Sequence, residues 1–87
     1  MYDYNICTEA DVKLFEGQCR ALERHIPGIR REQRLKDVDG TIVQEYRIGR
    51  DKVTVHNDET VGALYVRSDI PLEPYFEEEP PRAQAVI

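Results

Sequence analysis

Apolar residues recur at helical spacing in the first third of the chain. Successive apolar positions are separated by alternating steps of three and four residues, at Val12, Phe15, Cys19, Leu22 and Ile26. This spacing places one apolar stripe along a helix and leaves its opposite side polar. The pattern therefore predicts one amphipathic helix that packs on the rest of the protein.

Both ends of this helix carry local signals. Thr8 is predicted to be the N-cap, because its hydroxyl can accept backbone N–H groups of the first turn. Pro27 disfavours helical geometry at the residue before it, so the helix is expected to end near His25. Glu16 and Arg20 lie four residues apart on the polar side, which predicts an ion pair within the helix.

After Gly28 the pattern changes to runs rich in Val, Ile, Thr and Tyr that are separated by turn signals. The strongest turn signal is Asp39-Gly40, which predicts a two-residue type I′ turn because both residues tolerate a positive φ. The expected strands cover residues 31–38, 41–48, 52–57 and 61–67.

Two further segments affect the fold prediction. Residues 1–6 alternate Tyr and Ile with Asp and Asn, which makes them a candidate N-terminal strand. Residues 61–66 are apolar on both faces, as expected of a strand that is covered on each side or that meets another molecule. We therefore predict an α+β fold, with one amphipathic helix on a four-stranded antiparallel meander and a candidate fifth strand.

Size and composition limit the class of protein. The chain has 87 residues, of which 40% are hydrophobic and 33% charged, and its net charge is -5. These values predict a single soluble globular domain, assigned to residues 1–72, and an acidic, proline-rich tail at residues 73–87. No secretory signal or membrane span is recognisable, and the distance between Cys7 and Cys19 along a helix disfavours a disulfide. We expect a cytoplasmic protein.

The charge is distributed unevenly along the chain. Residues 20–36 contain six basic and two acidic residues, although the whole chain is acidic. Three interpretations remain open for this segment: a solvated face, contact with an acidic protein surface, or nucleic-acid binding through Arg30, Arg31 and Arg34. Nucleic-acid binding ranks last, because no aromatic residue interleaves with these arginines.

No pattern in the chain indicates catalysis. His25 and His56 have no ligand partners at metal-binding spacing, and we expect His25 to cap the helix C-terminus. Cys19 lies on the apolar stripe, and acidic residues near Cys7 oppose its ionisation. We therefore predict no enzymatic activity, no catalytic or metal site and no cofactor.

Acidic and aromatic residues outside the helix are the best candidates for binding a partner. The predicted partner-binding residues are Asp58, Glu59, Tyr75, Phe76, Glu77, Glu78 and Glu79. They indicate a small protein-interaction module, such as an inhibitor, immunity-type or accessory factor, that binds a basic surface of another protein. The alternative is a structural subunit that self-associates through its sheet, as a homodimer or larger oligomer.

Overall fold

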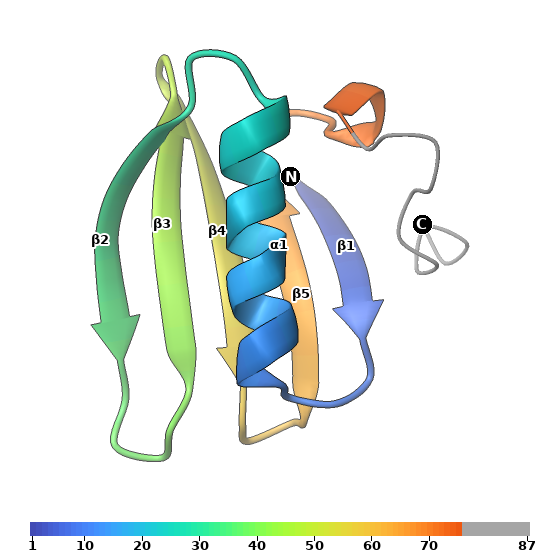
Figure 1. The fold of residues 1–87 in the computed structure, drawn as a ribbon, viewed down its shortest axis with the longest axis vertical. Coiled ribbons are helices and arrows are strands. Elements are labelled where there is room, and N and C mark those ends of the chain that lie inside the picture. Colours follow the sequence, from blue (N-terminus) through green and yellow to red (C-terminus); the bar gives the residue numbers. More distant parts are fainter. Residues whose placement is uncertain (76–87) are drawn as a thin grey trace.

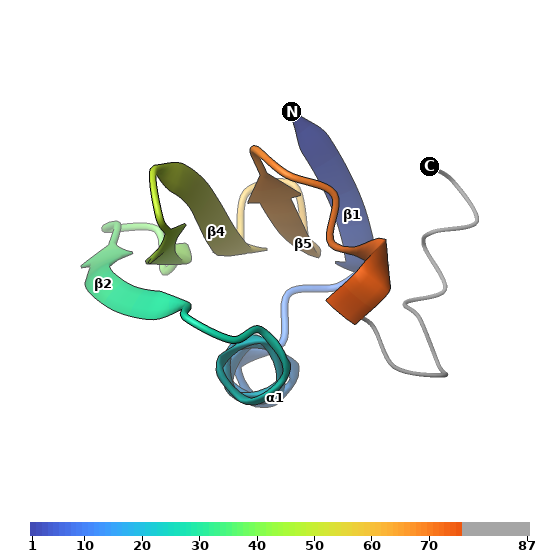
Figure 2. The ribbon, with the colours of Figure 1, turned by 90° about the horizontal axis from the view of Figure 1, so that it is seen from above.

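The protein folds into two layers, a sheet and a single helix laid across one of its faces (Figures 1 and 2). The computed structural model describes residues 1–75 of the chain. Its elements, in chain order, are β1 (Tyr2–Cys7), α1 (Val12–His25), β2 (Arg30–Lys36), β3 (Ile42–Ile48), β4 (Asp51–Asp58), β5 (Ala63–Ser68) and the 3-10 turn η1 (Glu73–Tyr75). The predicted α+β class, with one helix packed on an antiparallel meander, is confirmed.

The five strands form one antiparallel sheet in the order β1-β5-β4-β3-β2. Strands β2 to β5 follow one another as hairpins, and β1 pairs with β5 at one edge. The chain leaves this edge after β1, returns through α1 and enters β2 at the opposite edge (Figure 1). Helix α1 therefore crosses one face of the sheet, mainly over β4, and leaves the other face uncovered (Figure 2).

The core lies between α1 and the covered face of the sheet. The helix contributes Phe15, Cys19, Leu22 and the following Ile26, as the apolar spacing predicted. Alternate residues of the strands complete the core, namely Tyr4, Tyr46, Val53, Val55, Leu64 and Val66, together with Leu72 beyond β5. Removal of this apolar surface from water is the main contribution to the stability of the fold.

The helix begins later than predicted. Its N-cap is Asp11, whose Oδ1 accepts the backbone N–H of Leu14 at 3.1 Å, so the assignment of Thr8 as the N-cap was wrong. Asp11 also donates its own backbone N–H to the buried side chain of Asn57 at 2.8 Å, which fixes the helix start above the sheet. Val12 is consequently 51% exposed instead of buried. The predicted end at His25 is confirmed.

The β2–β3 hairpin is present, but its turn is not the predicted type. Gly40 has a φ of +96° and is the residue with positive φ here, whereas Asp39 has a negative φ, which excludes a type I′ turn. The backbone N–H of Gly40 donates to the Asp37 carbonyl at 3.1 Å, and the N–H of Asp37 donates to the Thr41 carbonyl at 2.8 Å. This pattern is typical of a three-residue loop that ends on a left-handed glycine.

Both edge strands contain a bulge. In β1 the register against β5 shifts between Asn5 and Cys7, and in β2 the register against β3 shifts between Arg31 and Arg34. In a regular strand, the residues two positions from Arg31 would share its face. The bulge instead brings Arg31 and Arg34, three residues apart, to the face that α1 covers, opposite Tyr46 and Gln44.

The segment after β5 packs against the end of β1. Leu72 is buried, and its backbone N–H donates to the Tyr4 hydroxyl at 2.8 Å, while the same hydroxyl donates to Glu73 Oε1 at 2.8 Å. Burial raises the pKa of Tyr4 to about 12, so the phenol stays protonated and able to donate. Tyr75 is half-buried against the core. Phe76 and the predicted glutamates 77–79 lie outside the described residues.

Candidate functional site at the loop end

Three connections of the chain meet at one end of the molecule, the lower end in Figure 1. They are residues 8–11, 37–41 and 58–62. Together with the first turn of α1, residues 12–14, they form the surface that we call the loop end. The Thr60 hydroxyl donates to Asp39 Oδ2 at 2.5 Å, and the backbone N–H of Glu59 donates to Thr41 Oγ1 at 3.0 Å. Because these bonds join the β2–β3 and β4–β5 loops, the two loops hold each other in position.

The loop end is acidic. It contains six acidic residues against one lysine, and these include the predicted site residues Asp58 and Glu59. The carboxylate of Asp58 accepts the backbone N–H groups of Thr60 and Val61 at 2.9 and 3.2 Å, which fixes its position. The hydrogen bond from Thr60 lowers the pKa of Asp39 below its usual value, so this carboxylate remains charged.

Exposed apolar side chains lie among these carboxylates. Seven large hydrophobic residues are exposed in the part of the chain that the structure describes, and four of them belong to the loop end: Val12, Leu14, Val38 and Val61. Val38, at the tip of the β2–β3 loop, is 103% exposed and Val61 is 68% exposed. Exposed apolar side chains gathered at one place mark interaction sites, whereas scattered ones do not.

The other predicted site residues lie elsewhere. Tyr75 follows β5 at the opposite end of the molecule, so it does not join Asp58 and Glu59 in one surface (Figure 1). Arg30 opens β2, is 69% exposed at its side chain and lies 4.0 Å from Glu32. The structure therefore separates the acidic loop end from the remaining candidates.

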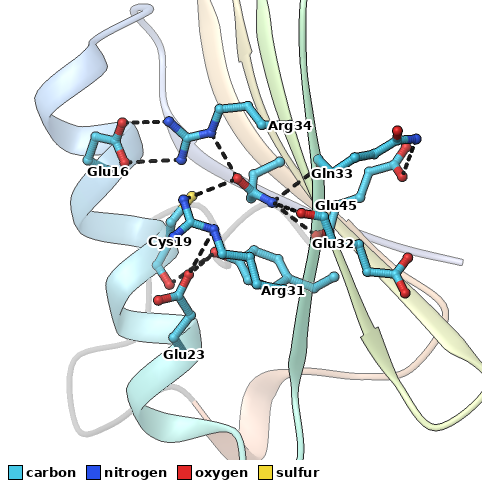
Figure 3. Close-up of polar contacts among 10 residues, drawn as sticks. Glu16, Cys19, Glu23, Arg31, Glu32, Gln33, Arg34 and Glu45 are labelled. Atoms are coloured by element: carbon cyan, nitrogen blue, oxygen red, sulfur yellow. Dashed lines mark hydrogen bonds and ion pairs between the residues drawn. The ribbon is translucent and has the colours of Figure 1, made fainter.

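Arg31 and Arg34 point toward the helix, although both side chains remain partly exposed to solvent (Figure 3). The guanidinium of Arg34 donates to both carboxylate oxygens of Glu16 at 2.8 and 3.2 Å, and its Cζ lies 5.1 Å from the centroid of the Phe15 ring. Arg31 lies 3.7 Å from Glu23. These contacts pair two of the six basic residues of the segment with carboxylates of α1. They also replace the Glu16–Arg20 pair that helical spacing predicted.

Gln44 connects this cluster to the bulge of β2. Its buried amide nitrogen donates to the carbonyl oxygens of Glu32 and Gln33 at 3.1 and 3.3 Å, which the bulge removes from regular pairing (Figure 3). Its Oε1 accepts a hydrogen bond from Arg34 Nε at 2.8 Å. Gln44 thereby stabilises the bulge and orients Arg34 toward α1.

The histidines and cysteines do not form a reactive group. His56 lies on the uncovered face of the sheet, stacked on Tyr65 with a centroid distance of 4.6 Å, and burial lowers its pKa. Cys19 lies on the covered side, where burial raises the pKa of its thiol. The sheet thus separates the two side chains. Cys7 ends β1 and His25 occupies the last turn of α1. Among residues 1–75, no three His, Cys, Asp or Glu side chains gather as a metal site.

A shallow groove runs along the uncovered face beside the loop end. It encloses about 470 Å³, and its lining includes Asp58, Val61, Ala63 and Tyr65. The hydroxyl of Tyr65 donates to Asp58 Oδ2 at 3.2 Å, and Arg67 lies over the Tyr65 ring at 5.4 Å. The groove therefore has an apolar floor and an acidic rim at the loop end.

Comparison of the chain with protein-family models, curated proteins and solved structures gives no match. In the described part of the chain, no helix has the length and apolar character needed to cross a membrane. Inferences about function therefore depend on the surface and chemistry of the chain itself.

Sequence reasoning proposed Asp58 and Glu59 as partner-binding residues but did not point to the exposed valines on the same surface. Val38 stands alone between two aspartates, and Val61 was assigned to a strand although it lies in the loop before β5. The signal in the sequence that could have indicated the apolar part of this surface was a single Val in an otherwise polar turn. The meeting of the loops depends on the sheet register, which the sequence does not specify directly.

Proposed function

We propose that the protein is a non-enzymatic interaction module whose loop end binds a basic surface of another protein. One observation gives the main support for this proposal. Exposed valines lie among fixed carboxylates at the loop end, so apolar and charged contacts are available in one place. We retain the cytoplasm as the proposed location, because both cysteines of the chain are unpaired.

The two kinds of side chain have separate roles in this proposal. Val38 and Val61 supply apolar area that loses water on binding, which is the main source of affinity. The carboxylates Asp39, Asp58 and Glu59 attract a basic partner and accelerate association. Because the loops are already hydrogen-bonded to each other, little conformational entropy is lost on binding.

Nucleic-acid binding has less support. Of the three arginines that suggested it, Arg31 and Arg34 contact carboxylates of α1, and this leaves Arg30 as the most exposed member. A phosphate backbone is bound by several unmatched cations that release counterions. Two of these three cations are instead paired with carboxylates of α1, which lowers the support for nucleic-acid binding.

The test combines capture of the partner with affinity measurements. The full chain and the variants Val38→Ser and Glu59→Lys are used to capture partners from the native host, followed by mass spectrometry and titration calorimetry of the identified complex. Asp51→Lys, a charge reversal at the opposite end, is the matched control. We expect both loop-end variants to weaken binding about tenfold, and the control to leave it unchanged.

Salt dependence separates the charged contribution from the apolar one. The affinity of the wild-type complex is expected to fall as salt is added, and this dependence should be smaller for Glu59→Lys but unchanged for Val38→Ser. If neither loop-end variant alters the affinity for the identified partner, the proposal is wrong.

A further inference from the structure

The uncovered face of the sheet carries an apolar and aromatic row that the core does not use. The strand register aligns Leu35 of β2, Val43 of β3, His56 of β4 and Tyr65 of β5 side by side across the sheet. Leu35 is 45% exposed, and the other three are partly buried by one another. Within residues 1–75, α1 covers only the opposite face, so this row has no partner layer (Figure 2).

Charged side chains of opposite sign border this row. Towards the upper end of Figure 1, the register places Arg30, Arg47 and Lys52 side by side. These three cations share two carboxylates, since Glu32 lies near both arginines and Glu45 lies 3.8 Å from Lys52. The net charge of this border of the face is therefore more positive than that of the chain as a whole, which is acidic.

The opposite border of the row is negative. Asp58 ends β4 and Asp37 follows β2, and neither forms an ion pair with another residue of the described part of the chain. The uncovered face thus has one positive border and one negative border, and between them lie the apolar row and, next to it, the polar residues Glu45, Thr54 and Arg67.

Such a face is complementary to itself. On β4, Lys52 and Asp58 lie three residues before and three residues after Val55. A two-fold axis above Val55, parallel to the row, places Lys52 of one copy over Asp58 of the other, and the symmetry repeats this contact. The same operation places Arg30 over Asp37. Two sheets that pack face to face in this way bury the apolar residues of both copies.

The surroundings of the aromatic residues favour face-to-face packing of two copies over the binding of nucleotide bases. The Tyr65 ring is stacked on His56 with an interplanar angle of 8°, and the Arg67 guanidinium also lies over the ring. These neighbours occupy the ring faces on which a base would stack. The exposed ring edges and the apolar neighbours remain available to a second layer of side chains.

From this charge pattern we infer that the uncovered sheet face binds a second copy of the chain to form a two-fold symmetric dimer. The inference goes beyond the proposed function, because its occupant is the same protein and its central residues lie on the sheet, while only Asp37 and Asp58 at its negative border also belong to the loop end. The contacts that define it are Lys52 with Asp58 of the second copy and Arg30 with Asp37 of the second copy.

Sedimentation equilibrium of the full chain tests the inference. We expect the mass to rise with concentration from 10.1 kDa to twice that value. Arg30→Glu and Asp37→Arg each reverse a charge at an exposed side chain, and each is expected to weaken the dimer about tenfold. An equimolar mixture of the two variants is expected to recover the dimer, because opposite charges then meet at both symmetric contacts.

The outcomes separate this inference from the proposed function. A wild-type chain that stays at 10.1 kDa up to near-millimolar concentration overturns the dimer and leaves partner binding at the loop end to be judged by its own test. The inference is also overturned if mixing the two variants does not restore the dimer while circular dichroism shows that both variants are folded. Val38→Ser is the control and is expected to dimerise like the wild type.

Discussion

Replacement of Gln44 by leucine tests how the fold holds the bulged edge strand β2. Gln44 is fully buried, and its amide bonds both to carbonyl groups of the bulge and to the guanidinium of Arg34. Leucine has a similar size but neither a donor nor an acceptor. Gln44→Leu therefore removes these hydrogen bonds while it leaves the packing volume almost unchanged.

The expected loss of stability follows from the number of hydrogen bonds that the Gln44 side chain makes. The amide nitrogen has two hydrogens, so it makes two full hydrogen bonds among the three carbonyls within 3.1 to 3.3 Å. Its Oε1 accepts a charged donor from Arg34 at 2.8 Å and a longer one from Arg31 at 3.4 Å. At about 1 kcal/mol for each hydrogen bond, with partial rehydration of the exposed bulge, the loss is about 2–3 kcal/mol. This corresponds to a decrease in Tm of about 10–20 °C for a domain of this size.

The assay is equilibrium unfolding in urea followed by far-ultraviolet circular dichroism, since the chain has no tryptophan. The matched control is Gln33→Leu, because Gln33 is exposed and its side chain bonds only to the Glu45 side chain, at 3.3 Å. We expect the control to change the free energy of unfolding by less than about 0.5 kcal/mol. If Gln44→Leu also stays within about 0.5 kcal/mol of the wild type, the assigned role of the amide is refuted.

Three further predictions concern titratable groups. The Arg34 guanidinium lowers the pKa of Glu16 below its ordinary value of 4.5, so this pair stabilises the fold above that pH, and its contribution is lost as the pH falls through the lowered pKa. Glu16→Gln should therefore flatten the fall of Tm from about pH 5 to about pH 3, and a Tm profile that is the same as that of the wild type would contradict the pair. Cys7 should react with a thiol reagent in the folded protein and Cys19 only after unfolding, and equal rates would show that Cys19 is accessible. Burial lowers the pKa of His56, so its NMR titration midpoint should lie below 6.5, and a higher midpoint would show that the ring is solvated.

Local signals in the sequence were sufficient for the fold class and most elements. The spacing from Phe15 to Ile26 predicted the buried side of α1, and Pro27 predicted its end, because both act within one or two turns of the chain. The start of α1 was missed because Thr8 and Asp11 are both good N-cap residues, and local pattern did not distinguish them. The contact of Asp11 with Asn57, a residue of β4 that is distant in sequence, fixes the choice in the fold.

The candidate surfaces depended on register, which the sequence pattern left undetermined. A single extra residue in β2 moved Arg34 to the covered face, where it pairs with Glu16, and no residue type marks that position as a bulge. Asp58 and Glu59 were predicted from charge alone. Their association with Val38 follows from the pairing of two hairpin loops, which became visible only with the folded chain.

The bulges of β1 and β2 have a consequence for how copies of the chain associate. A regular edge strand offers evenly spaced N–H and C=O groups onto which another strand can be added, and repetition of that step produces filaments. Here both edges of the sheet are irregular, whereas the central pairings β3–β4 and β4–β5 are continuous. Lateral growth of the sheet is thus impeded on each side, and the face-to-face association that we infer closes after two copies.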